Sequence, residues 1–167
     1  MTTYQFLPMN EQYASAICKW MYPEPYNLYD MGDSRDTIDE LLNGDYFYAI
    51  DSQDMLVGYI CSGNSSRVPG GYPIGIYDNN KYLDFGVGLR PDYTGKGNGL
   101  EFLSQGIEYL MKESNVHNIQ LVVAAFNERA IKVYERAGFV QGCSFKSKVD
   151  DEEVDFIMMR CSLHKTI

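Results

Sequence analysis

Apolar and polar positions follow two different rhythms along the chain. Short runs rich in Tyr, Phe, Val and Ile alternate with longer segments whose apolar residues recur every three or four positions. The first pattern predicts strands, and the second predicts amphipathic helices. The predicted strands are residues 4–8, 46–51, 55–61, 81–89, 119–126, 139–147 and 154–161. The predicted helices are residues 10–20, 34–42, 97–112 and 127–137.

Cap residues mark the ends of the helices. Asn10 can cap the first helix, Ser34 or Asp36 the second, and Asn127 the fourth. Gly138 can end the fourth helix in a left-handed conformation. Because strands alternate with helices, without a long linker or an internal repeat, the fold class is predicted to be α/β.

Length and composition predict one globular domain, residues 1–167. A chain of 167 residues with 45% hydrophobic and 22% charged residues can bury one full core. No basic patch precedes an apolar run at the start, and no stretch approaches the roughly 20 apolar residues of a membrane helix. We therefore expect a soluble, cytoplasmic protein with no membrane partner. The four cysteines are widely spaced among apolar neighbours, which predicts reduced, packed thiols.

The acidic composition bears on the choice of partner. A formal net charge of −9 argues against a nucleic-acid partner, because a phosphate backbone requires Lys and Arg at the contact surface. It favours cationic partners, although surplus carboxylates can also serve only to keep a protein soluble. His117 and His164 have no partners at metal-ligand spacing, so no metal is expected.

A glycine-rich segment joins the strand 81–89 to the helix 97–112. It reads Leu89-Arg90-Pro91-Asp92-Tyr93-Thr94-Gly95-Lys96-Gly97-Asn98-Gly99. Glycine costs about 1 kcal/mol per interior helix site, so three at alternate positions indicate close approach of a ligand to the backbone. Unpaired amides at a helix start attract anions, and a diphosphate fits that description. A flexible turn without a ligand is the alternative.

Two common phosphate-binding motifs do not match this segment. In a Walker loop the lysine precedes Ser or Thr, whereas Lys96 precedes Gly97. A dinucleotide fingerprint would require a third glycine at Leu100, and the preceding strand is not the first of the chain. Hydrolysis of nucleoside triphosphates and a Rossmann enzyme are therefore both disfavoured.

Two blocks of sequence resemble the GNAT superfamily of N-acetyltransferases. The run Leu89 to Gly99 resembles its motif A, Q/R-x-x-G-x-G/A after a strand ending in V/L-x-P. The run Asn127 to Phe139 resembles its motif B, N-x-x-A-x-x-[LV]-Y-x-[KR]-x-G-F. The blocks stand in the superfamily's order, and the predicted elements cover the whole chain. Thr94 replaces the usual Arg or Gln, and this change removes one side-chain contact to phosphate. Asn98 replaces a common apolar residue.

The resemblance implies a fold and a cosubstrate. The fold would be a central, mostly antiparallel mixed sheet of six to seven strands, splayed at the cofactor site and flanked by about four helices. The cosubstrate would be acetyl-CoA. Its pyrophosphate would be cradled by Thr94, Gly95, Lys96, Gly97, Asn98 and Gly99.

The resemblance also places the thioester arm of the cosubstrate. The pantetheine arm would pair with the backbone of Val87 and Leu89, and Asn127 would contact the arm. An amide near Gly88 or Leu89 would stabilise the oxyanion, and Gly86 with Gly88 would permit a bulge there.

Tyr134 and Asp84 are the candidate catalytic residues. By resemblance, Tyr134 hydrogen-bonds the thioester sulfur and protonates the departing thiolate. Tyr134 also lies seven positions after Asn127, two helical turns on, so both side chains can project from one face. An ordinary half-buried aromatic is the alternative. Asp84 is the candidate base that accepts the proton of the amine, and a solvated or hydrogen-bonded structural aspartate is its alternative.

The aromatic loop (residues 20–30) occupies the position at which the superfamily builds its acceptor site. Tyr26 and Tyr29, beside carboxylates, suit a cationic amine. Packing of the loop on the core, with no chemical role, is the alternative.

Together these features predict an acetyl-CoA-dependent N-acetyltransferase acting on a primary amine, with a small cationic amine as acceptor. One alternative is a non-catalytic acyl-CoA-binding sensor or regulatory module with the same fold. Another is an interaction protein that uses an exposed sheet edge, for example to form a homodimer.

Overall fold

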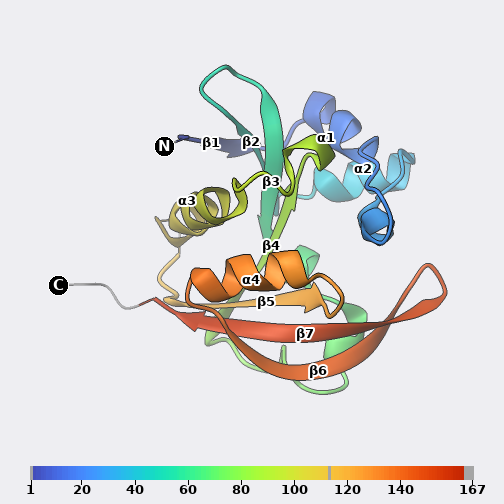
Figure 1. Ribbon diagram of the computed structural model, residues 1–167, viewed down its shortest axis with the longest axis vertical. Coiled ribbons are helices and arrows are strands. Elements are labelled where there is room, and N and C mark those ends of the chain that lie inside the picture. Colours follow the sequence, from blue (N-terminus) through green and yellow to red (C-terminus); the bar gives the residue numbers. More distant parts are fainter. Residues whose placement is uncertain (1, 113, 164–167) are drawn as a thin grey trace. The chain divides into compact units, whose positions relative to one another are not determined.

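A computed structural model describes residues 2–112 and 114–163, so His164 lies outside the described residues. These residues form seven strands and four α-helices (Figure 1). The strands are β1 (Gln5–Pro8), β2 (Tyr46–Ile50), β3 (Leu56–Ser62), β4 (Tyr82–Leu89), β5 (Asn118–Ala124), β6 (Val140–Val149) and β7 (Glu152–Ser162). The α-helices are α1 (Glu11–Cys18), α2 (Arg35–Leu41), α3 (Gly99–Lys112) and α4 (Glu128–Arg136). Four short 3₁₀ turns are η1 (Tyr26–Tyr29), η2 (Gly63–Ser66), η3 (Pro69–Gly71) and η4 (Pro91–Tyr93).

Across the sheet, the order of the strands is β1-β2-β3-β4-β5-β7-β6. The pairs β1/β2, β2/β3, β5/β7 and β6/β7 are antiparallel, whereas β4 and β5 are parallel. The register of β4 and β5 runs from Tyr82 opposite Asn118 to Asp84 opposite Gln120, although β4 continues to Leu89. The mixed, mostly antiparallel sheet of the predicted fold is confirmed.

By its internal contacts the chain divides into two compact units. Unit 1 contains the residues up to Cys61 together with Val87–Gly106, and unit 2 contains Ser62–Gly86 and the residues from Ile107 onward. Strand β4 and helix α3 therefore each contribute residues to both units. The prediction of a single domain over residues 1–167 stays a prediction.

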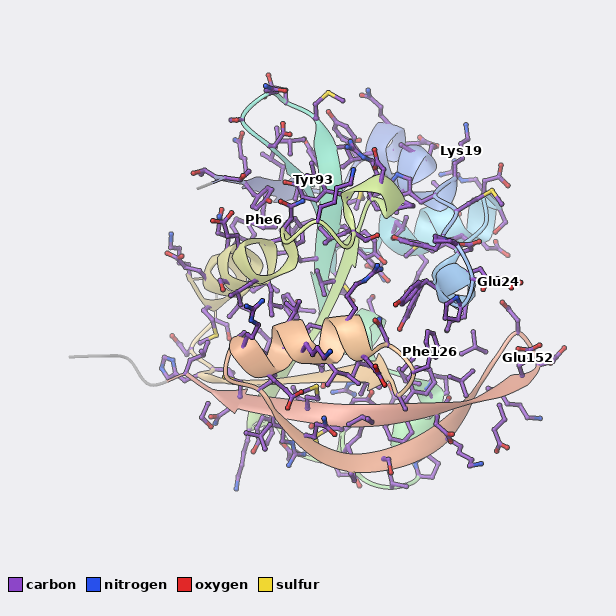
Figure 2. All side chains as sticks on the ribbon, viewed as in Figure 1. Phe6, Lys19, Glu24, Tyr93, Phe126 and Glu152 are labelled. Atoms are coloured by element: carbon purple, nitrogen blue, oxygen red, sulfur yellow. The ribbon has the colours of Figure 1, made fainter. Side chains whose placement is uncertain are left out.

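Two apolar clusters form the core of unit 1. One gathers α1, α2 and the ends of β2 and β3 around buried Ile17, Leu41 and Cys61. In the other, Phe102 of α3 packs against β1, with its ring centroid 5.6 Å from that of Phe6, a residue labelled in Figure 2. The regularly spaced apolar residues of α1 and α3 are therefore buried, as the sequence pattern predicts.

The core of unit 2 lies on β5 and β7, and α4 runs alongside these two strands (Figure 1). Ile119, Leu121 and Met159 are among its buried side chains. The turn η3 docks on β6, where the Gly70 amide donates to the Ser147 hydroxyl at 2.9 Å. A Cβ on Gly70 would lie 2.2 Å from the Lys146 carbonyl oxygen, so this contact requires glycine.

Several local predictions are confirmed, whereas some predicted boundaries are wrong by two residues, among them the start of the third helix. Asn10, Ser34 and Asn127 cap α1, α2 and α4, each accepting a backbone amide of the first turn. The third helix was expected from residue 97 but begins at Gly99. Gly97 has φ of 82°, a left-handed conformation that cannot be part of a right-handed helix.

The four cysteines are free, as predicted, but they are not all packed. Cys18, Cys61 and Cys161 are buried, whereas Cys143 is exposed. Cys143 lies on β6, the last strand in the sheet order, at the register shift between Gln141 and Ser144. Among the residues that the structure describes, no helix has both the length and the apolar character needed to cross a bilayer.

Candidate active site

The glycine loop (residues 94–99) has a backbone suited to an anion. Gly95 and Gly97 adopt φ of 71° and 82°, conformations that side chains with a Cβ rarely take. At the start of α3, the Phe102 amide donates to the Asn98 carbonyl at 3.1 Å. The amides of residues 99–101 therefore precede the helical ladder and lack acceptors within the helix. Such amides, at the positive end of the helix dipole, favour a phosphate.

The two departures from motif A have local roles in this loop. The Thr94 hydroxyl donates to the Pro91 carbonyl at 2.6 Å, and the Asn98 amide group donates to the Tyr93 carbonyl at 3.4 Å. Both side chains thus hold the turn that leads into α3. Because these two side chains bond within the turn, an anion at the loop would meet backbone amides.

Arg90 anchors the start of the loop to β3. Its amide donates to the Val57 carbonyl at 2.8 Å, and its guanidinium donates to the Leu56 carbonyl at 2.7 Å. The same guanidinium donates to the Asp92 carboxylate at 2.5 Å, which lowers the pKa of that carboxyl. The residue at which the chain enters the segment leading to the glycine loop is therefore held in place against β3.

The end of β4 presents its backbone in a defined direction. Because the Arg90 amide points to β3, alternation along the strand turns the N–H and C=O groups of Leu89 and Val87 to the other edge. These are the two residues predicted to pair with pantetheine. The ring of Tyr59 lies against Gly88, and a Cβ on Gly88 would lie 2.3 Å from Tyr59 Cε1. Close packing thus explains Gly88, and the expected bulge stays a prediction.

The aromatic loop contains the turn η1, which holds both candidate acceptor residues, Tyr26 and Tyr29. The ring of Tyr29 meets Tyr22 edge-on, with centroids 6.4 Å apart. Tyr22 donates its amide to the Asp30 carboxylate at 2.8 Å and its hydroxyl to the Leu89 carbonyl at 2.6 Å. Loop and strand β4 are therefore joined within unit 1.

In unit 2, Asn127 and Tyr134 lie at the two ends of α4. The Asn127 side-chain oxygen accepts the Ala130 amide at 3.2 Å, as an N-cap. The ring of Tyr134 meets Phe139 edge-on at 6.0 Å, and Gly138, with φ of 102°, turns the chain between them. The Tyr134 side chain is partly exposed, as a proton donor to a ligand must be.

Asp84, the candidate base, lies in a hydrogen-bond network of unit 2. It is 6% exposed, and both of its carboxylate oxygens have partners. Arg67 Nε donates to Oδ2 at 2.8 Å, and Gln120 Nε2 donates to Oδ1 at 2.9 Å. The bond to Asp84 also raises the pKa of the Arg67 guanidinium. These contacts favour the alternative interpretation of Asp84 as a structural aspartate, and the base role stays a prediction.

The network extends beyond Asp84 in both directions. Gln120 also donates to the Ile76 carbonyl at 3.1 Å and accepts from Arg160 Nε at 2.9 Å. The Arg160 guanidinium lies over the ring of Tyr82 at 4.2 Å, and that of Arg67 over Tyr77 at 4.9 Å. Residues 67–77 are thereby fastened to β4, β5 and β7.

Sequence patterns did not identify four residues of these arrangements. They are Tyr22, Arg67, Gln120 and Arg160. Each acts through a partner 17 to 67 positions away, and such contacts leave no periodic signal in one sequence. The single hint was Gln120, a polar residue inside an apolar strand, since buried polar groups need partners.

A mixed sheet in which a strand, a glycine loop and a helix follow one another is the architecture of N-acetyltransferases, and the sequence agrees. The model of the acetyltransferase (GNAT) family matches residues 14–139. The chain belongs to the GNAT acetyltransferase family.

Individual relatives are similar to this chain over different lengths. The spermidine N(1)-acetyltransferase of Vibrio cholerae is 26% identical over 132 residues, which cover 75% of this chain and 66% of that relative. A mycothiol acetyltransferase of Propionibacterium freudenreichii is 47% identical over 53 residues, 32% of this chain and 17% of the relative. The matches thus span 66% or less of these curated relatives.

Among solved structures, the spermidine N-acetyltransferase of Vibrio cholerae in complex with CoA and spermine has the same fold. The TM-score is 0.68 at 19% identity, and 95% of each chain is covered.

Proposed function

We propose that this protein transfers an acetyl group from acetyl-CoA to a primary amine, and that the acceptor is a small cationic amine. The observation that carries the proposal is the glycine loop. In a member of the GNAT family, a segment with two left-handed glycines leads from β4 to the amides at the start of α3. That combination suits the diphosphate of CoA.

The backbone of β4 supports the second part of the proposal. The outward N–H and C=O groups of Val87 and the outward N–H of Leu89 offer the pairing that an extended amide chain such as pantetheine requires, whereas the Leu89 carbonyl accepts the Tyr22 hydroxyl. An amide near Gly88 or Leu89 would donate to the thioester oxygen as negative charge develops there. Asn127 is proposed to contact the same arm, in addition to capping α4.

The chemistry balances without a covalent enzyme intermediate. The amine nitrogen attacks the carbonyl carbon, an N–C bond forms, the nitrogen loses its surplus proton to water and the C–S bond breaks. Tyr134 supplies the proton that the departing thiolate takes, and its phenol is regenerated from solvent. An ammonium ion has no lone pair, so the amine must first lose a proton. Since Asp84 is held by Arg67 and Gln120, we propose that water receives this proton.

Three observations support a cationic acceptor. The chain carries a net charge of −9. The aromatic loop offers the rings of Tyr26 and Tyr29, and ring faces attract cations. The Vibrio cholerae relative carries the name of a spermidine acetyltransferase.

An alternative function, a non-catalytic acyl-CoA-binding module, is favoured by one observation. The only carboxylate predicted to act as a base has both oxygens occupied. The two functions differ in whether bound acetyl-CoA is consumed.

Thiol release from acetyl-CoA in the presence of an amine panel tests the proposal. The panel contains a polyamine, an aminoglycoside, an amino acid and a peptide with a free N-terminus. We expect amine-dependent release with the cationic small molecules. Tyr134→Phe should lower kcat about 100-fold, while the Kd for CoA changes less than about twofold. Tyr109→Phe, which alters another partly buried helical tyrosine of unit 2, is the matched control.

Unchanged turnover in Tyr134→Phe would refute the role of Tyr134 as acid. Calorimetric binding of CoA without thiol release across the whole panel would favour the binding module instead.

A further inference from the structure

One direct and one indirect contact link the aromatic loop to β4, and both lie within unit 1. The first is the hydrogen bond of 2.6 Å from the Tyr22 hydroxyl to the Leu89 carbonyl. In the second, Trp20 stacks on Tyr59 with centroids 6.2 Å apart, and Tyr59 in turn covers Gly88. Loop residues two positions apart are thus linked to consecutive residues of β4, Tyr22 directly to Leu89 and Trp20 to Gly88 through Tyr59 of β3.

The hydrogen bond from Tyr22 reaches the edge of β4 that faces away from β3. The Arg90 amide donates to Val57 of β3, so the polar groups of Leu89 point to the opposite edge. The Tyr22 hydroxyl therefore donates to the carbonyl of Leu89, next to the backbone groups that are proposed to pair with the cosubstrate. A shift of β4 at this point must move the phenol, and a shift of the phenol must move the strand.

The remaining contacts of Tyr22 restrict its freedom. Its amide is held by the Asp30 carboxylate at 2.8 Å, which closes the loop on itself. Its ring lies edge-on to Tyr29, one of the candidate acceptor residues. Burial, and after it the charge of Asp30, raise the pKa of the phenol, so it stays a hydrogen-bond donor at neutral pH.

We propose that Tyr22 is a positioning residue that couples the acceptor loop to the cosubstrate strand through the Leu89 carbonyl. The proposal rests on the proposed function. It predicts that acetyl-CoA and the amine assist each other's binding, because coupling between two sites is reciprocal. Removal of the hydroxyl should weaken this assistance about two- to tenfold, the effect typical of one such hydrogen bond.

Trp20 provides a direct probe, since it is the only tryptophan of the chain and lies in the coupled loop. Fluorescence of Trp20 is measured during titration with CoA in the wild-type protein, in Tyr22→Phe and in Tyr48→Phe. Tyr48 of β2 lies opposite Tyr59, and its ring contacts Tyr13 with centroids 4.2 Å apart. Tyr48→Phe therefore removes a hydroxyl from unit 1 while Tyr22 stays intact, and it serves as the matched control. Calorimetry measures CoA binding, and thermal melting confirms that each variant folds.

We expect CoA to change Trp20 fluorescence in the wild type and in Tyr48→Phe. In Tyr22→Phe the change should be lost although calorimetry still detects binding within about twofold of the wild-type Kd. Acrylamide should quench Trp20 about twofold more strongly in Tyr22→Phe without ligand. In kinetics, the KM for the amine at saturating acetyl-CoA and the KM for acetyl-CoA at saturating amine should both rise about two- to tenfold, because the coupling is reciprocal.

A wild-type fluorescence change that survives in Tyr22→Phe, or CoA binding that leaves Trp20 unchanged in the wild type, would overturn the coupling. A Kd for CoA alone that rises as much as the two KM values, together with a lower melting temperature, would assign Tyr22 a merely structural role and reject the proposal. If the wild type binds no CoA, the proposed function fails. Acrylamide quenching then still decides whether Tyr22 holds the loop.

Discussion

The Asp84→Asn variant distinguishes a structural aspartate from a general base. Both groups that contact the Asp84 carboxylate donate hydrogen bonds to it, and two arginines, which can only donate, fix this arrangement. Arg160 donates to Gln120 Oε1, which orients Gln120 Nε2 toward Asp84, and Arg67 donates from the other side. The amide introduced by Asp84→Asn has one acceptor oxygen and one NH₂ group. Either orientation therefore sets two donors against each other, and rotation of Gln120 only moves the conflict to Arg160.

The magnitude follows from burial. The Asp84 side chain is 8% exposed and that of Arg67 is 24% exposed. Breaking a buried ion pair costs about 3–5 kcal/mol, and an unsatisfied buried group costs about 1–3 kcal/mol. Because Arg67 keeps some access to water, we expect the free energy of unfolding to fall by about 2–4 kcal/mol. For a protein of this size, that loss lowers Tm by about 5–15 °C.

Urea and thermal unfolding, followed by circular dichroism, measure the change. Asp155→Asn is the matched control in the same unit, since the Asp155 carboxylate is 66% exposed and lies 3.8 Å from Lys146. Its cost should be below about 0.5 kcal/mol. A destabilisation below about 1 kcal/mol in Asp84→Asn, together with a loss of kcat of about 100-fold or more, would refute the structural account and assign Asp84 as the base.

Two further predictions concern unit 1. Gly58→Ala should lower the free energy of unfolding, measured in a urea titration, by about 1–3 kcal/mol. The new Cβ would lie 2.6 Å from the Gly88 carbonyl oxygen and 2.7 Å from Phe102 Cζ. A variant as stable as the wild type would show that the strands can separate freely. The pKa of the Tyr22 phenol is raised by burial above its ordinary 10.0, so above about pH 10 the unfolded chain loses this proton first and the stability falls as pH rises. Tyr22→Phe should show a shallower decline between pH 10 and 11, by up to about 1.4 kcal/mol per pH unit, and an identical decline would contradict the burial of this phenol.

Local sequence signals account for much of the fold. The caps Asn10, Ser34 and Asn127 fix helix starts because a short polar side chain must satisfy the first amides. The turn η3 lies outside every predicted strand and helix, since the amide of Gly70 is held by Ser147 of β6, 77 positions further along the chain.

The candidate site was predictable only in part. The glycine loop is recognisable because it uses backbone conformation, and glycine is what such a conformation requires. Asp84 was assigned by its place on a strand, but its partner Arg67 comes from an irregular segment whose path no periodicity reveals. The same is true of Tyr22, which looked like one aromatic among many until its contact with Leu89 distinguished it.

Direct detection of the acetylated product tests the central claim. The protein is incubated with acetyl-CoA labelled with ¹³C in the acetyl group and with spermidine, and mass spectrometry follows the label. Transfer of the labelled acetyl group to the amine, reduced about 100-fold in Tyr134→Phe, is the predicted result. Label that stays on CoA with spermidine and with every other amine of the panel, although CoA binds, would contradict the account.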